Sequence, residues 1–478
     1  MARSDGWEQP ERCTPVPRAG GRGRLSTMSK TAAVILAAGK GTRMKSALPK
    51  VLHPLAGRPM IGHVLDALAP LDCAPCVVVI APDLAAVAEA VAPHPSAVQA
   101  EQLGTADAVK AARAALAEAR GTVLVLYGDT PLITGDTLAA MVRARENAPG
   151  TAVVVLGFRP EDPGAYGRLV VDDEGTLEAI VEAKDATPAE RAIPLCNSGV
   201  MAVDGTLLFD LVDRVGNDNA KGEYYLTDIV ALARGDGYVC RVIEAPESEL
   251  AGINSRVELA QAEAVIQERL RRAAMEAGAT LIDPASVFFA YDTRLGRDVT
   301  VEPNVVFAPG VSVGDNVEIR AFCHLEGATI ADGAIIGPFA RLRPGAQVGP
   351  EARVGNFVEV KNAVLEAGAK ASHLSYIGDA RVGADANIGA GTITCNYDGF
   401  QKSHTDIGAG AFIGSNSALV APVAIGDGAI VGAGSVIARD VEADALAINR
   451  APQKDSPGWA AKFRARRRAR KQAGTKKG

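Results

Sequence analysis

The sequence predicts an α/β domain followed by a parallel β-helix. Apolar runs alternate with helical patterns from Thr31 to about Asn254, and aliphatic residues then recur every six residues from 299 to 438. Strands that alternate with helices are typical of βαβ units around a mainly parallel sheet. A six-residue period fits neither an amphipathic helix nor an alternating strand, which need periods of 3.6 and 2. It indicates short strands stacked in coils.

The α/β part is expected to begin shortly after a disordered extension. Residues 1–28 are rich in Arg, Gly and Pro, and Met28 directly precedes the first credible strand, so it is a candidate for the true start of the folded protein. Strands are predicted at residues 33–36, 77–80, 123–126 and 153–156. Ala-rich helices are predicted between them at residues 84–91 and 106–119. This α/β domain is therefore assigned to residues 29–254.

A long helix is predicted to connect the two parts. It begins at Asn254–Ser255 and ends before Gly278, giving a helical linker over residues 255–278. The β-helix is assigned to residues 279–450, and residues 451–478 form a basic tail that we expect to be disordered. Binding of this tail to a polyanion is the sharper alternative.

Two runs of aliphatic residues keep the register of the β-helix. They are Ile330, Ile336, Leu342, Val348, Val354 and Val360, and then Ile407, Ile413, Leu419, Ile425, Val431 and Ile437. Inward aliphatics stack coil on coil, and the Gly residues that often follow them suit tight corners. A low-complexity linker or an aggregation-prone strand array is the alternative. The rhythm breaks between Lys361 and Ile377, and such departures are where loops or sites are expected.

Composition excludes several function classes. Aromatic residues make up 4% of the chain and the net charge is −6, which argues against a surface that stacks nucleic-acid bases or attracts polyanions. No apolar run reaches the roughly 18 residues of a membrane span, and the N-terminus lacks a signal peptide's apolar region, so a soluble, cytoplasmic protein is expected. Cys73 and Cys76 form one CxxC without a partner pair, which disfavours zinc.

The first chemical motif follows the first predicted strand. That strand runs into LAAGKGTRM, residues 36–44, and Pro49–Lys50 follow soon after. Glycines let backbone amides approach phosphates, and Lys40, Arg43 and Lys50 add positive charge. The spacing matches neither GxxxxGK[ST] nor GxGxxG. On spacing alone, a purely structural turn stays an equal alternative.

The loop resembles the signature loop of sugar-nucleotide pyrophosphorylases. With the β-helix, residues 30 to 452 resemble the bacterial bifunctional N-acetylglucosamine-1-phosphate uridyltransferases and glucosamine-1-phosphate N-acetyltransferases. The further segments that carry this resemblance are QAEQLGTADA (99–108), YGDTPL (127–132), YGR (166–168), VEAKDA (181–186), CNSG (196–199), KGEYYLTD (221–228) and GINSR (252–256). The resemblance implies a Rossmann-like nucleotidyltransferase domain, a left-handed β-helix, UTP and acetyl-CoA as co-substrates, Mg²⁺ as cofactor and a homotrimer.

The resemblance also implies a site for UTP and the UDP-sugar. Its residues are Leu36, Ala37, Gly39, Lys50, Gln99, Gln102, Gly104, Thr105, Tyr127, Gly128, Asp129, Gly167, Glu182, Asn197 and Asn254. Arg43 and Lys50 would stabilise charge on the triphosphate, and Asp129 and Asn254 would ligate Mg²⁺. Gly167, Glu182 and Asn197 would hold the acetylated sugar. Asp129 also follows the strand 123–126, at the sheet edge where α/β folds place ligands, although a loop cap is the alternative.

His373 is the candidate base of a second site. It lies in ASHLSYIGDA, followed by NIGAGTITCNYDG at 387–399, and these segments resemble the acetyltransferase site. The resemblance makes His373 the general base that takes a proton from the attacking amine. Glu359 is a competing base or a surface carboxylate. The implied glucosamine-phosphate residues are Arg343, Lys361, Tyr376, Asn387 and Lys402, and the implied acetyl-CoA residues are Asn396, Tyr397, Ser415, Ala433 and Arg450.

One part of this second site follows from spacing. Arg343 and Lys361 are 18 residues apart, which places them at equivalent positions on successive three-strand coils. They should therefore share one side of the β-helix and could converge on an anion. Two solvated surface charges are the alternative. Residues 394–406 are expected to form a projecting loop.

The leading interpretation is a bifunctional enzyme that makes UDP-N-acetylglucosamine. Its β-helix would acetylate glucosamine 1-phosphate, and its α/β domain would then transfer a uridylyl group from UTP to N-acetylglucosamine 1-phosphate. A single-activity pyrophosphorylase with an oligomerising β-helix and a non-catalytic scaffold are the alternatives. The expected partners are these small molecules and two further copies of the chain, without nucleic acid or membrane insertion.

Overall fold

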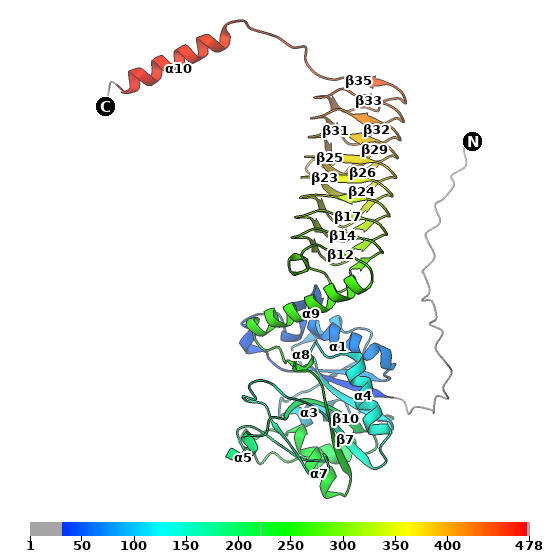
Figure 1. The fold of residues 1–478 in the computed structure, drawn as a ribbon, viewed down its shortest axis with the longest axis vertical. Coiled ribbons are helices and arrows are strands. Elements are labelled where there is room, and N and C mark those ends of the chain that lie inside the picture. Colours follow the sequence, from blue (N-terminus) through cyan, green and yellow to red (C-terminus); the bar gives the residue numbers. More distant parts are fainter. Residues whose placement is uncertain (1–30, 220, 476–478) are drawn as a thin grey trace, which may run out of the picture. The chain divides into compact units, whose positions relative to one another are not determined.

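The computed structural model describes residues 31–219 and 221–475, which fall into two compact units (Figure 1). The first unit contains residues 31–52 and 61–252, and the second contains residues 53–60 and everything described after residue 252. The extension expected at residues 1–28, including Met28, lies outside the described residues. The observed division differs from the predicted boundary at residue 254 chiefly because residues 53–60 belong to the second unit.

A mixed nine-stranded sheet forms the centre of the first unit. Its main path runs β11-β7-β10-β6-β1-β4-β5, and β8 and β9 extend it from β10. The strands are β1 (Ala32–Leu36), β4 (Cys76–Ile80), β5 (Ser96–Val98), β6 (Thr122–Tyr127), β7 (Thr151–Phe158), β8 (Arg168–Val171), β9 (Leu177–Val181), β10 (Cys196–Asp204) and β11 (Val239–Glu244). The strands β5, β4, β1 and β6 are parallel, whereas β10 runs antiparallel to its neighbours. Adjacent parallel strands bring their carboxyl ends to one edge.

Helices cover both faces of this sheet. They are α1 (Met60–Leu68), α2 (Ala85–Ala90), α3 (Thr105–Ala111), α4 (Gly135–Glu146), α5 (Pro188–Arg191), α6 (Leu208–Asp213), α7 (Ile229–Gly235) and α8 (Glu247–Leu250). Alternate residues of β1 enter two separate cores: Val34 joins a core with α3, α6 and α7, and Ile35 joins another with α1 and α4. A strand that is buried on both faces has no polar side, which explains its unbroken apolar run.

The second unit begins with a hairpin and a long helix. The hairpin pairs β2 (Pro54–Leu55) with β3 (Arg58–Pro59), and the helix is α9 (Arg256–Glu276). The predicted linker helix is thus present, and Ser255 caps it by accepting a hydrogen bond from the Glu258 amide at 3.3 Å. The Ala56 amide donates to Glu263 Oε2 of α9 at 2.8 Å. This bond, together with the Tyr291 amide that donates to the Ala56 carbonyl at 2.8 Å, ties the hairpin to the second unit.

Two parallel sheets build the walls of a β-helix in the second unit (Figure 1). The ten-stranded sheet contains β12 (Thr280–Leu281), β14 (Thr300–Val301), β17 (Glu318–Ile319), β20 (Ile335–Ile336), β23 (Arg353–Asn356), β25 (Lys370–His373), β27 (Asn387–Ile388), β30 (Phe412–Ile413), β33 (Ile430–Val431) and β35 (Leu446–Ala447). The fourteen-stranded sheet contains β13 (Arg294–Leu295), β15 (Val306–Phe307), β16 (Ser312–Val313), β18 (His324–Leu325), β19 (Thr329–Ile330), β21 (Arg341–Leu342), β22 (Ala346–Val348), β24 (Glu359–Leu365), β26 (Tyr376–Val382), β28 (Ile393–Cys395), β29 (Thr405–Ile407), β31 (Ala418–Val420), β32 (Val423–Ile425) and β34 (Val436–Ile437).

Inward aliphatics form one continuous core along the coils. Leu342 pairs with Leu325 on one side and Val360 on the other, and all three are fully buried. No loop interrupts the described coils between Lys361 and Ile377, where the rhythm breaks in the sequence. Leu365 and Ala371 continue the stack there, and the apparent break is only a shortening of the spacing by one residue. The expected projection lies between β28 and β29.

The end of the described chain differs from the prediction. Residues 459–475 form helix α10 (Trp459–Thr475) rather than a disordered tail. Ala, Arg, Lys and Gln, which dominate this segment, have high helix propensities. The rings of Trp459 and Phe463 stack one turn apart, 5.2 Å between centroids, and the Arg467 guanidinium lies 5.3 Å from the Phe463 ring. Local interactions of this kind favour a helix without tertiary contacts.

Candidate functional site

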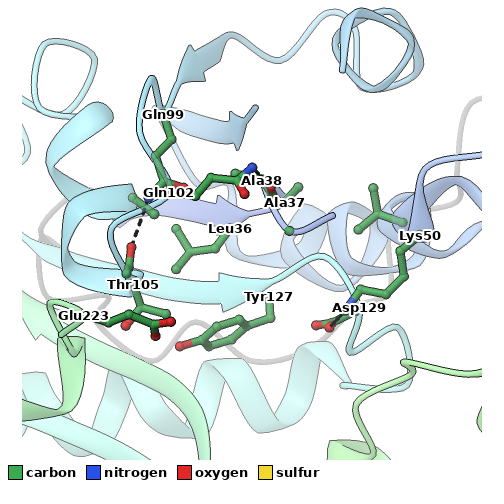
Figure 2. Close-up of a pocket in the computed structure, with 14 residues that line it drawn as sticks. Leu36, Ala37, Ala38, Lys50, Gln99, Gln102, Thr105, Tyr127, Asp129 and Glu223 are labelled. Carbon is green, nitrogen blue, oxygen red and sulfur yellow. Dashed lines mark hydrogen bonds and ion pairs between the residues drawn. The ribbon is translucent and has the colours of Figure 1, made fainter. Parts of the chain in front are cut away.

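A pocket of about 270 Å³ opens at the carboxyl ends of β1 and β6 (Figure 2). Leu36 and Tyr127 end these two strands and face each other in the parallel register. The lining residues are Leu36, Ala37, Ala38, Gly39, Lys50, Val51, Gln99, Gln102, Gly104, Thr105, Ala108, Tyr127, Asp129 and Glu223. The pocket brings together ten of the residues predicted for UTP and the UDP-sugar. Sheet topology explains this, because ligands of α/β folds bind beyond the carboxyl ends of strands.

Opposite charges meet at one end of the pocket. Lys50 Nζ pairs with Asp129 Oδ2, and both side chains are largely shielded from solvent, being 12% and 20% exposed (Figure 2). The loop after β1 approaches Lys50 closely: Gly41 adopts φ +59°, and a β-carbon added there would lie 2.6 Å from Lys50 Cβ. Gly41 is therefore required both by its left-handed backbone and by lack of space.

Glutamine side chains hold the opposite end of the pocket. Gln102 Nε2 donates to the Ala38 carbonyl at 2.7 Å, and Gln99 Nε2 donates to the Gly104 carbonyl at 3.0 Å (Figure 2). Gly104 has φ +131°, and a β-carbon there would lie 2.5 Å from the Tyr224 carbonyl oxygen. The Leu226 amide donates to Thr105 Oγ1 at 2.9 Å. This loop is thus fixed against residues 224–226, with its amide and hydroxyl groups at the pocket.

The three amino acids predicted to hold the acetylated sugar, Gly167, Glu182 and Asn197, lie together beside this pocket. The Asn197 amide donates to the Gly167 carbonyl at 2.8 Å, and a β-carbon on Gly167 would lie 3.6 Å from Glu182 Oε1. Burial raises the pKa of the Glu182 carboxyl. Burial and then the charges of Asp129 and Glu182 raise the pKa of the Tyr127 phenol. The Tyr127 phenol therefore stays neutral, and it lies between the pocket that it lines and the carboxylate of Glu182.

Not every predicted residue lines the pocket. Gly128 lies between two lining residues, and its amide donates to the Leu36 carbonyl at 3.0 Å. Arg43 is exposed in a short 3-10 helix (Thr42–Met44). Asn254 belongs to the second unit, where its amide donates to Glu258 Oε2 at 2.6 Å.

Sequence reasoning missed four lining residues, namely Ala38, Val51, Ala108 and Glu223. Ala38 lies inside the LAAGKGTRM loop and Glu223 inside KGEYYLTD, so these two segments had been singled out without a role for either residue. Ala108 ends the quoted segment QAEQLGTADA, likewise without a role, whereas nothing in the local pattern of Val51 distinguishes it from a core residue.

The donor atoms in the pocket suit a hard divalent cation. Across residues 31–219 and 221–475, no group of three or more His, Cys, Asp or Glu side chains is arranged to hold a metal ion. Mg²⁺ does not require such a group, because it keeps several waters and takes few protein oxygens. The Asp129 carboxylate lines the pocket at the Lys50 end, whereas Glu223 lies at the opposite end beside Thr105, so Asp129 is the carboxylate that could hold the ion with the phosphates (Figure 2). The residues present therefore fit Mg²⁺ held largely by water and substrate phosphates.

A group of cations lies on the fourteen-stranded sheet of the β-helix. Arg343 immediately follows β21, and Lys361 lies on β24, one coil further along, as their spacing predicted. The Lys361 ammonium beside Lys402 lowers the pKa of Lys402 below its usual range. The two ammonium groups repel each other, and the nearby Asp379 carboxylate offsets only part of this repulsion, because the pKa of Lys402 stays lowered. Such an arrangement is typical of an anion site.

Tyr376 and Asn396 border these cations. The Asn396 amide lies 3.5 Å from Tyr376 Oη and also bonds Asp379. Glu359 is held by Arg343 at 2.8 Å and by Arg341 at 3.7 Å, so it serves as a partner of the cation group. Asn387 lies on β27 in the other sheet, opposite Lys370, and is not brought into this group by the strand register.

The register of the ten-stranded sheet aligns one residue from each of four coils. Ala371, Ile388, Ile413 and Val431 pair in succession across β25, β27, β30 and β33. The residues two positions after them form one column along the coils, namely His373, Ala390, Ser415 and Ala433. Arg450 Nη1 donates to the Ala433 carbonyl at 2.7 Å. Predicted acetyl-CoA residues and the predicted base therefore share one column. Ala390 lies in the same column but was not singled out from the sequence. Tyr397 lies exposed in the projecting loop.

His373 is firmly anchored at the end of this column. The Leu374 amide donates to the Asn356 carbonyl at 2.9 Å, and Ser375 Oγ donates to the His373 carbonyl at 2.9 Å. Leu374 adopts φ +51°, a left-handed conformation that costs an L-residue roughly 1–2 kcal/mol. The backbone around His373 is thus held in one conformation by bonds to the neighbouring coil.

Other candidates from the sequence carry no chemistry. Burial raises the pKa of the Cys73 thiol to about 12 and that of Cys76 to about 11, so neither is a reactive thiolate or a ready metal ligand. In the described part of the chain, no helix has both the length and the apolar character needed to cross a membrane.

A nucleotide-type pocket at a parallel sheet edge, joined to a β-helix with its own cation group and histidine, defines a nucleotidyltransferase fused to a hexapeptide-repeat transferase. Models of both classes match the chain: the MobA-like NTP transferase domain over residues 33–193, and the bacterial transferase hexapeptide (six repeats) over residues 292–327, 327–362 and 404–439.

Curated relatives match almost the whole chain. It is 68% identical over 441 residues to the bifunctional protein GlmU of Rhodospirillum rubrum, covering 92% of this chain and 99% of that protein. It is 63% identical over 443 residues to the bifunctional protein GlmU of Paramagnetospirillum magneticum, covering 93% and 98%. The chain therefore belongs to the bifunctional GlmU family and is both an uridyltransferase and an acetyltransferase. The predicted family, the Rossmann-like and left-handed β-helix folds, and the two enzyme classes are confirmed.

Proposed function

We propose that the two sites carry out consecutive steps of UDP-N-acetylglucosamine synthesis. Two observations carry this proposal: the Lys50–Asp129 pair at the sheet edge of the first unit, and, on the β-helix, the cations Lys361 and Lys402 at one sheet with His373 on the other. A silent, merely oligomerising β-helix would need neither the paired cations nor the anchored histidine. A scaffold would not need the Lys50–Asp129 pair.

In the first domain, the sugar 1-phosphate oxygen attacks the α-phosphorus of UTP, and pyrophosphate leaves as the bond to the β-phosphate oxygen breaks. Lys50 and Arg43 neutralise charge on the phosphates, and the loop from Gln99 to Thr105 holds the uridine nucleotide. Gly167, Glu182 and Asn197 hold the acetylated sugar. Mg²⁺, held by Asp129 with Asn254 as the second predicted ligand, would supply further charge neutralisation on the phosphates.

In the β-helix, we propose that Arg343, Lys361, Tyr376 and Lys402 bind the phosphate and sugar of glucosamine 1-phosphate, with Asn387 of the other sheet as a further predicted ligand residue. Its amine attacks the thioester carbonyl of acetyl-CoA, the carbon–sulfur bond breaks, and His373 takes the amine proton and delivers it to the departing thiolate. Asn396, Tyr397, Ser415, Ala433 and Arg450 line the path of acetyl-CoA. We further propose a cytoplasmic homotrimer, with 29–254 and 279–450 as its two catalytic domains.

Paired assays of the two half-reactions test this assignment. We expect His373→Ala to lower CoA release from acetyl-CoA and glucosamine 1-phosphate by roughly 10²–10⁴-fold, the usual contribution of a general base. Pyrophosphate release from UTP and N-acetylglucosamine 1-phosphate should be unchanged. Lys50→Met should give the reverse pattern. If either variant lost both activities while remaining folded, or kept both, the two-site assignment would be wrong.

A further inference from the structure

Asn356 contacts the ring of His373 directly. The two residues face each other in the register of β23 and β25, and Asn356 Oδ1 lies 2.6 Å from His373 Nδ1. The hydrogen bond is therefore made between side chains on successive coils, whose spacing is set by the backbone ladder. No sequence pattern had indicated a role for Asn356.

The chemistry of an amide fixes the direction of this bond. A side-chain carbonyl oxygen can only accept a hydrogen bond, so Nδ1 of the imidazole carries the proton and donates it. In neutral imidazole the other nitrogen, Nε2, then holds the free lone pair. The bond thus determines which ring nitrogen can accept a proton.

We propose that Asn356 is a positioning residue for acetyl transfer, which holds His373 in the Nδ1-protonated tautomer and presents Nε2 to the substrate amine. This inference rests on the proposed role of His373 as the general base. Asn356 acts through the imidazole and does not itself exchange a proton with the substrate.

The surroundings of the ring explain why an amide suits this position. His373 and Asn356 line a cleft of about 480 Å³. Arg320, which follows β17, and Arg353 of β23 also line this cleft. Lys370 begins β25, the strand that ends at His373. Among the described residues that line the cleft, none is a carboxylate. A carboxylate against Nδ1 would favour the imidazolium form, which cannot accept a proton, whereas an amide orients the ring without adding charge.

The first test is the Asn356→Ala variant in the full-length enzyme. We expect kcat for acetyl transfer to fall roughly 10- to 100-fold, the range known for removal of the hydrogen-bond partners of metal-bound histidines. KM for glucosamine 1-phosphate and the rate of uridylyl transfer should change little. Ser372→Ala is the matched control, because Ser372 lines the same cleft next to His373, and it should leave both activities intact.

The second test is Asn356→Asp, which keeps an acceptor oxygen and adds a charge. We expect activity to be largely retained at alkaline pH, with the acidic limb of the kcat profile moved to higher pH. A purely structural role for Asn356 would not produce such a shift. Nitrogen-15 NMR of the histidine rings gives a direct reading, in which the His373 signals of the wild-type enzyme should show Nδ1 protonated.

The outcomes separate this inference from the proposed function. If His373→Ala abolishes acetyl transfer but both Asn356 variants keep the wild-type kcat and pH profile, Asn356 has no positioning role and the assignment of the base stands. A neutral ring protonated on Nε2 would also overturn the inference. If His373→Ala retains acetyl transfer, the proposed base itself is wrong. Should Asn356→Ala fail to fold, the pH profile of Asn356→Asp still decides.

Discussion

Replacing Lys361 by methionine removes one of two ammonium groups that meet on the β-helix. Lys361 lowers the pKa of Lys402, which shows that the two charges repel each other in the free protein. A phosphate placed between them would accept a charge-assisted hydrogen bond from each. One such bond contributes roughly 1.5–3 kcal/mol, and each 1.4 kcal/mol is tenfold in affinity. We therefore expect KM for glucosamine 1-phosphate to rise roughly 10- to 150-fold.

The pH dependence of the same variant provides a second reading. Because its pKa is lowered, Lys402 loses its proton at a lower pH than an ordinary lysine, so sugar-phosphate binding in the wild type should weaken early on the alkaline side. Removing Lys361 lets the pKa of Lys402 return upward, and the alkaline limb of kcat/KM should move to higher pH. The protonated form of Lys402 is disfavoured by folding, so the unfolding free energy of the wild type should rise with pH across this window.

The assay is CoA release at varied glucosamine 1-phosphate, with uridylyl transfer measured on the same preparation. Lys370→Met is the matched control, because Lys370 is an exposed lysine of the same β-helix on the other sheet. An unchanged KM in Lys361→Met, an equal rise in Lys370→Met, or an alkaline limb that moves to lower pH would refute the shared phosphate site.

Two further predictions concern each unit separately. Gly104→Ala should raise KM for UTP and leave acetyl transfer unchanged, because a β-carbon there would lie 2.5 Å from the Tyr224 carbonyl oxygen and the backbone has φ +131°. If titration calorimetry gave the variant the same UTP affinity as the wild type, this prediction would be wrong. Leu342→Ala should destabilise the β-helix by roughly 2–5 kcal/mol, because the side chain is fully buried between Leu325 and Val360. Denaturant unfolding compared with Leu342→Met checks this, and equal midpoints for the two variants would disprove the core assignment.

Much of the fold could be predicted from local patterns. The six-residue rhythm identified the β-helix because each inward aliphatic marks one wall of a coil, and Leu342 and Val360 do stack as neighbours. The strand that contains Val34 and Ile35 was recognisable because both faces of it are buried. The motif after that strand then located the first pocket.

The remainder depends on contacts that leave no trace in a local pattern. The hairpin at residues 53–60 joins the second unit through bonds of Ala56 to Glu263 and to Tyr291, which are far from it in sequence. The partnership of Asn356 with His373 depends on coils of 17 residues at that point, which the apparent break in rhythm concealed. Helix α10 was mistaken for a disordered tail because its high charge outweighed its helix propensity in our interpretation.

The column that joins His373 to Ala433 also sets a length scale. Neighbouring strands lie about 4.8 Å apart, so the three coil steps from His373 through Ala390 and Ser415 to Ala433 span roughly 14 Å. This span cannot stretch or shrink gradually, because it changes only by whole coils. The β-helix therefore fixes the distance from Ala433 to His373 in whole-coil steps. If a thioester substrate is held near Ala433, the chain that carries its acyl group must be about as long as this distance to present the carbonyl at His373.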